Sequence, residues 1–173
     1  EDVTIGRLLQ FGLAPALKQN FEEIQRAPYL VQMLLAEISH EGTAEFFRVN
    51  YDGYWEKFKQ GTVISGDNKV SERIQKNIED TNFVALTLNK SIQSALHIWE
   101  EGRKKPKLEE EPDSSTEAND DVDDEMEGYP TDLKDAFERW NLEVAVLNNN
   151  TGRKCLYRLL SASEISALQS EVI

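Results

Sequence analysis

The stretch from Pro28 to Gly42 reads PYLVQMLLAEISHEG. Its apolar residues recur at spacings of three and four, which predicts a helix with a wide apolar stripe. The stripe consists of Leu30, Val31, Leu34, Leu35 and Ile38. Pro28 suits the first turn of such a helix, and Gly42 is typical of the position just beyond a helix end. We therefore expect this helix to supply the centre of the core.

The segments on either side predict more helices. On the N-terminal side, Thr4 can cap a short first turn that Gly12 ends, and Pro15 can open a helix over residues 15–26. On the C-terminal side, Thr43 can cap a helix that runs to about Lys59. A further apolar period over residues 70–99 predicts one long helix of about 45 Å, at 1.5 Å per residue. A helical bundle is the architecture that these patterns favour.

The helix expected over residues 43–59 would have a strongly aromatic face. That face comprises Phe47, Tyr51, Tyr54, Trp55 and Phe58. We expect most of it to be core, but Tyr54 and Trp55 are consecutive and would point about 100° apart around a helix. One of the two should be accessible, and exposed tyrosine and tryptophan commonly anchor protein partners. Tyr54 and Trp55 are therefore the predicted partner-binding residues.

Charge is concentrated in one segment of the 173-residue chain, whose formal net charge is −13. The segment from Pro106 to Pro130 holds eleven acidic residues and one basic residue, so most of the negative charge lies there. Too few apolar groups are present to offset the roughly 1–2 kcal/mol per residue that backbone ordering costs. We expect residues 104–130 to be disordered and to act as a solubilising linker or to bind a basic partner. Phosphate repulsion makes nucleic acid an unfavourable partner for them.

A basic cluster stands directly before the acidic run. Lys104, Lys105 and Lys107 lie in an extended, proline-containing context of the kind that nuclear import receptors bind. The alternative interpretation is a helix C-terminus whose cations complement the macrodipole. A basic cluster followed by an acidic tract is typical of eukaryotic nuclear proteins, so we expect a nuclear location, with the cytoplasm as the alternative.

The pattern changes after the acidic run. Thr131 can cap a helix, and period-two alternation over residues 142–160 around an Asn-rich turn predicts a β-hairpin. Ser161 and Glu164 have the spacing of a capping box, which predicts a final helix. This αββα unit is too small to fold alone readily, so we expect it to pack on the helical part.

Little in the sequence points to catalysis. His40 and His97 have no cysteine or carboxylate at metal-ligand spacing, and the single Cys155 argues against a disulfide or zinc framework. Common nucleotide, zinc-protease, esterase and calcium motifs are absent from the sequence. We therefore predict no cofactor, no metal and no enzymatic activity. No apolar stretch approaches the roughly 20 residues that cross a bilayer, so we expect a soluble chain.

The predicted fold class is a mainly α protein, a helical bundle with a small C-terminal β-hairpin and helix. It would comprise a helical domain over residues 1–103, a disordered segment over 104–130 and the αββα unit over 131–173. The predicted function is non-catalytic protein binding, as a subunit or adaptor of a eukaryotic nuclear complex. A regulatory or accessory domain of an enzyme is one alternative, and a winged-helix-type nucleic-acid-binding module is another.

Overall fold

The computed structural model describes residues 3–25, 27–104, 129–149 and 157–172. The described residues are 49% helical but also form two small sheets, with the strands placed between helices. The three-stranded sheet has the order β1-β2-β3, and the two-stranded sheet pairs β4 with β5. The predicted helical bundle is therefore wrong as a fold class. The segment expected to be disordered lies almost wholly outside the described residues.

The stretch from Pro28 to Gly42 forms an edge strand. β1 spans Met33–Ile38 and pairs antiparallel with β2, which spans Ala44–Val49. Burial alternates strictly from Val31 to Glu37, so every second side chain faces the core. A short, nearly continuous apolar run satisfies helical and strand periods equally, which is why its spacing misled the helix prediction. Gly42 lies in the turn between β1 and β2.

The expected aromatic helix is a second hairpin. β3 spans Trp55–Phe58 and pairs antiparallel with β2, so the predicted stripe of Phe47, Tyr51 and Phe58 does not exist. The strands are joined through a turn closed by a hydrogen bond from Gly53 N–H to the Asn50 carbonyl. Gly53 has φ 81°, and a side chain there would collide with the backbone of the helix beside it. Glycine is thus required for both the turn and the helix contact.

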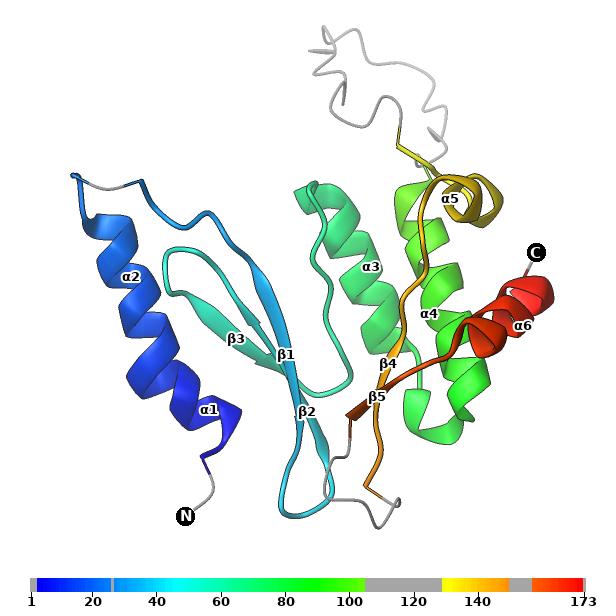
Figure 1. Cartoon of the computed structure of the whole chain (residues 1–173), viewed down its shortest axis with the longest axis horizontal. Coiled ribbons are helices and arrows are strands. Elements are labelled where there is room, and N and C mark those ends of the chain that lie inside the picture. Colours follow the sequence, from blue (N-terminus) through cyan, green and yellow to red (C-terminus); the bar gives the residue numbers. More distant parts are fainter. Residues whose placement is uncertain (1–2, 26, 105–128, 150–156, 173) are drawn as a thin grey trace, which may run out of the picture.

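Helices at the N-terminus cover one face of this sheet (Figure 1). α1 (Ile5–Leu8) is capped by Thr4 as predicted, but it continues without a stop at Gly12 through the π-helix η1 (Leu9–Leu13) into α2 (Ala14–Glu22). Their inner side chains meet the sheet in one core cluster. Its buried members are Leu9, Leu17, Phe47 and Val49.

The predicted long helix is two helices. α3 (Asn68–Asp80) and α4 (Leu88–Arg103) are separated by the short 3-10 helix η2 (Phe83–Ala85), and they lie side by side (Figure 1). The apolar period was correct, since Val70, Ile74 and Ile98 form a second buried cluster. The chain reverses direction between the helices, so the apolar face of α3 packs against the apolar face of α4.

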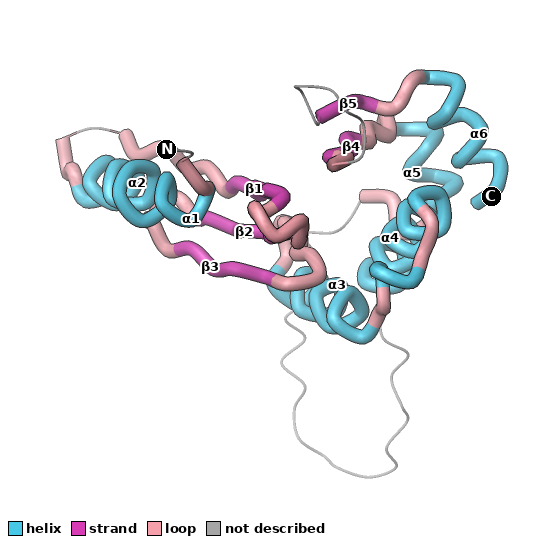
Figure 2. Tube along the Cα trace, turned by 90° about the horizontal axis from the view of Figure 1, so that it is seen from below, coloured by secondary structure: helices cyan, strands magenta, loops and turns pink. Residues whose placement is uncertain are grey.

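The C-terminal elements match their prediction more closely. α5 (Leu133–Arg139) precedes β4 (Ala145–Leu147) and β5 (Tyr157–Leu159), and α6 (Ala162–Val172) ends the chain. The capping box is confirmed, because Ser161 N–H donates to Glu164 at 2.8 Å and Glu164 N–H donates to Ser161 Oγ at 3.3 Å. α5 is capped by Asp132, one residue after the expected cap Thr131. The β4–β5 hairpin and the α3–α4 pair lie on the side of the three-stranded sheet opposite α1 and α2 (Figure 2).

Candidate functional site

The two predicted partner-binding residues lie on opposite faces of the three-stranded sheet. Trp55 packs half-buried against the first core cluster, with its ring centroid 6.2 Å from that of Phe47. Tyr54 is 57% exposed, and its hydroxyl donates to Glu56 at 3.1 Å. That hydrogen bond raises the pKa of Tyr54 above its ordinary value. Because side chains alternate along a strand, Tyr54 and Glu56 share the face that α1 and α2 leave uncovered. The partner-binding role of both residues stays a prediction.

Of the predicted import signal, the structure describes only Lys104; Lys105 and Lys107 lie outside the described residues. Lys104 follows the last residue of α4, and its ammonium group contacts Glu101 at 2.6 Å and Glu100 at 3.6 Å. The hydrogen bond to Glu101 is the main cause of the raised pKa of Lys104. Its side chain is half exposed, so it is accessible to a receptor.

Titratable groups do not gather into a metal-binding arrangement in the described part of the chain. His40 and His97 are both exposed. No group of three or more histidine, cysteine, aspartate or glutamate residues there could hold a metal ion. Among the helices that the structure describes, none is long and apolar enough to span a membrane.

An apolar groove of about 580 Å³ runs between the uncovered face of the three-stranded sheet and the β4–β5 hairpin. The sheet wall is lined by Leu34, Ala36, Glu37, Ile38, Gly42, Ala44 and Phe46, and the facing wall by Leu88, Ala145, Val146, Leu147 and Tyr157. Leu34 is 47% exposed and Leu147 is 40% exposed. Asn149, which follows β4, lies beside Gly42 in the β1–β2 turn, so these two segments approach each other at one end of the groove. We call this feature the inter-sheet groove.

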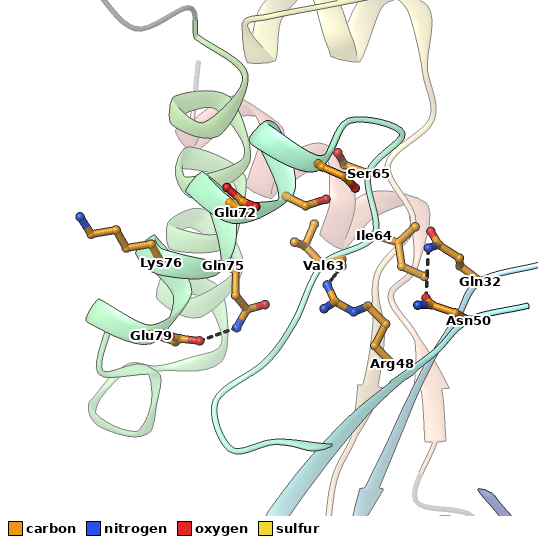
Figure 3. A pocket seen from close by; sticks show the side chains of 12 residues that line it. Gln32, Arg48, Asn50, Val63, Ile64, Ser65, Glu72, Gln75, Lys76 and Glu79 are labelled. Atoms are coloured by element: carbon orange, nitrogen blue, oxygen red, sulfur yellow. Dashed lines mark hydrogen bonds between the residues drawn. The ribbon is translucent and has the colours of Figure 1, made fainter. Parts of the chain in front are cut away.

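A polar cleft of about 440 Å³ separates the end of β2 from α3 (Figure 3). Arg48 crosses its floor: the guanidinium donates to Glu56 at 2.7 Å and to the carbonyl of Val63 at 3.4 Å. On the same wall, Gln32 Nε2 donates to Asn50 Oδ1 at 3.1 Å. The bond to Val63 joins the sheet to the loop that precedes α3, and the other two bonds lie within the sheet and its turn.

An aromatic junction closes the base of the acidic segment. Arg103 Nε donates to the Pro130 carbonyl at 2.9 Å, and the guanidinium lies 5.1 Å above the ring of Trp99 and 5.8 Å from that of Tyr129. The Trp140 ring packs edge-on against Trp99 at 6.3 Å. Partial burial lowers the pKa of Arg103 from its ordinary value. These contacts hold the two ends of the segment next to each other.

Comparison with known proteins supplies no family. No family model matches the sequence, and no curated protein matches it. The candidate site therefore stands on geometry alone, and the inter-sheet groove is the feature that sequence reasoning missed. The signal available in the sequence was the alternation of Val31, Met33 and Leu35 with Gln32, Leu34 and Ala36.

Proposed function

We propose that the chain is a non-catalytic protein-binding subunit and that its partner covers the inter-sheet groove. The observation that supports this most is the outward half of β1, where Leu34 and Ala36 face the groove and are exposed. Contiguous exposed apolar surface on a soluble protein commonly marks an interaction site.

The groove offers enough apolar surface to stabilise a complex. Fully burying a leucine is worth about 1.5–3 kcal/mol, so covering the half-exposed Leu34, Leu88 and Leu147 contributes about 1 kcal/mol each. Tyr157, 53% exposed, lines the same groove and has the residue type that dominates binding energy at interfaces. The groove thus has both an apolar centre and an aromatic group at its margin.

A pair of charge variants tests this proposal. Leu34→Lys places a cation in the groove, whereas Val84→Lys places one on η2, where Val84 is 96% exposed and lines none of the described cavities. Both side chains are accessible, so thermal unfolding of the two variants should differ little from that of the unmodified protein. Full-length tagged chains are then purified from eukaryotic cells, and the recovered proteins are quantified.

The expected result is one protein in near-stoichiometric amount with the unmodified chain and with Val84→Lys, and its loss with Leu34→Lys. Recovery of the same proteins with all three chains, or of none with any, contradicts the proposal.

We propose a nuclear complex as the setting, on the evidence of Lys104, Lys105 and Lys107 together. The exposed Lys104 supports this proposal, while its ion pairs with Glu100 and Glu101 suit the helix-capping alternative. The test is a full-length fusion to a fluorescent protein assembly too large to enter the nucleus passively. Substituting all three lysines by alanine should shift it to the cytoplasm. An unchanged nuclear signal would exclude the cluster as the determinant.

A matched control removes the same amount of charge elsewhere. Lys59, Lys69 and Lys76 lie away from α4's C-terminus, and all three are exposed. Their triple alanine variant should keep the location of the unmodified fusion.

A further inference from the structure

The backbone of β1 is unpaired along its outer side in the described part of the chain. β1 is an outer strand of the three-stranded sheet, and among the described strands it pairs with β2 alone. At the turn, Ser39 N–H donates to the Thr43 carbonyl, so Ser39 and Thr43 form a hydrogen-bonded pair. Hydrogen-bonded and non-bonded pairs alternate along an antiparallel ladder. The N–H and C=O groups of Leu34, Ala36 and Ile38 therefore point away from β2, and we call them the outer edge of β1.

This outer edge has few of the devices that keep natural edge strands from pairing. Those devices are charged residues, proline, bulges and short length. β1 has six residues in unbroken register with β2 and contains no lysine or proline. Its one charged residue, Glu37, faces α1 and accepts a hydrogen bond from Ile5 N–H at 2.8 Å. Its carboxylate is held on the α1 side of the sheet, and Glu37 is also among the residues that line the inter-sheet groove.

The opposite edge of the same sheet is protected. β3 has four residues, and two of them are Glu56 and Lys57. Lys57 pairs with Glu45 at 2.8 Å, and Arg48 pairs with Glu56 at 2.7 Å. The two edges of this small sheet therefore differ, and the β1 edge is the less protected one.

We propose that the outer edge of β1 receives an extended strand from a different protein, whose alternate side chains fill the inter-sheet groove. This inference deepens the proposed function and rests on it. The same residues supply both contacts, because Leu34, Ala36 and Ile38 direct their backbone groups outward and their side chains into the groove. A strand added there gains main-chain hydrogen bonds from the edge and apolar burial from the groove.

Charge decides between a different protein and a second copy. Each chain carries a formal net charge of −13, so two copies repel each other. The tip of the β1–β2 hairpin carries the exposed carboxylate of Glu41. The complementary partner is thus an apolar strand with a basic residue at the end that lies beside this tip.

Nuclear magnetic resonance of the full-length, isotopically labelled chain tests the proposal with a defined probe. The probe is a synthetic peptide of alternating valine and threonine that ends in two lysines, and the control peptide has proline in place of its central valine. We expect the first peptide alone to shift the amide signals of Leu34, Ala36 and Ile38 and to slow their hydrogen exchange at least about tenfold. Chain variant Ala36→Pro removes one outward N–H without breaking a bond to β2, and it should abolish the effect while the protein still unfolds cooperatively.

Each other outcome overturns strand addition. If the peptide shifts groove methyl groups but not the outer-edge amides, or if Ala36→Pro folds and still binds, the groove binds by its side chains alone and the proposed function survives. If neither the groove methyl signals nor the outer-edge amide signals shift at the peptide's solubility limit, strand addition fails. The purification with Leu34→Lys still decides the proposed function. If the outer-edge amides are already protected in the free chain and lose protection on dilution, a second copy occupies the edge.

Discussion

Replacing Phe47 by alanine should expose the difference between the observed sheet and a helical arrangement of the same residues. Phe47 is 2% exposed, at the centre of the core cluster beneath α1 and α2. An aromatic side chain buries about 150–250 Å², and at about 25 cal/mol per Å² the loss, less what alanine retains, is about 3–4 kcal/mol. A chain of this size loses about 2–4 °C of Tm per kcal/mol, so the Tm should fall by about 6–16 °C.

Tyr51 provides the matched comparison. On a helix, Tyr51 lies one turn after Phe47 on the same face, so both truncations would be equally costly. In the observed fold Tyr51 lies in the turn before β3, is 37% exposed, and contacts the Phe21 ring at 5.2 Å. Tyr51→Ala should therefore cost only about 1 kcal/mol.

Urea unfolding of the full chain, followed by far-ultraviolet circular dichroism, measures both free energies. Equal destabilisation by Phe47→Ala and Tyr51→Ala would refute the sheet register. So would a Phe47→Ala variant that keeps the stability of the unmodified protein.

Three more predictions follow from local geometry. Gly53→Ala should lower the free energy of unfolding by more than about 1 kcal/mol, because φ is 81° and the new methyl group would collide with α2. Gly66 has open space around it, so Gly66→Ala should change the free energy of unfolding by less than about 0.5 kcal/mol in the same urea assay. Arg103→Ala should cost about 1–3 kcal/mol and alter tryptophan fluorescence, since the Pro130 hydrogen bond and the stacking on Trp99 are lost together; unchanged stability and emission would contradict the junction. Hydrogen bonds from Ser161 hold the pKa of Glu164 below its ordinary value of 4.5, so the carboxylate stabilises α6 above pH 4.5 and this stabilisation is lost as the pH falls through the lowered pKa. Glu164→Gln should remove this pH dependence of stability, and an NMR titration that gives Glu164 a pKa of 4.5 or higher would contradict the prediction.

Local signals predicted the C-terminal part of the fold and failed in the N-terminal part. The Ser161–Glu164 box and the alternation around β4 depend on neighbours within a few residues, so sequence was sufficient there. Leu34 and Leu35, by contrast, fit a helical stripe and a two-sided strand equally well. Asn50, Asp52 and Gly53 disfavour a helix and are the local evidence for a turn, whereas the aromatic period across them favours a helix.

The candidate site could not be predicted from the sequence, because it is assembled from segments that lie far apart along the chain. The inter-sheet groove brings Leu34 of β1 opposite Leu147 of β4, and Leu88 joins from the start of α4. Nothing in the spacing of these three residues shows that they face one another. Only the pairing of the strands and the packing of the hairpin place them together. The half-buried Trp55 and exposed Tyr54 likewise depend on the strand register.

Because of the aromatic junction, the stability of the fold should depend little on the length of the acidic segment. Arg103 and Pro130 are bonded to each other, so folded structure fixes the two points between which residues 105–128 run. The entropy of loop closure grows only with the logarithm of length, and doubling the loop costs about 0.6 kcal/mol. Evolution can therefore lengthen, shorten or recode this stretch at little thermodynamic cost. An experimenter can use the same freedom to insert a fluorescent reporter there without touching the groove.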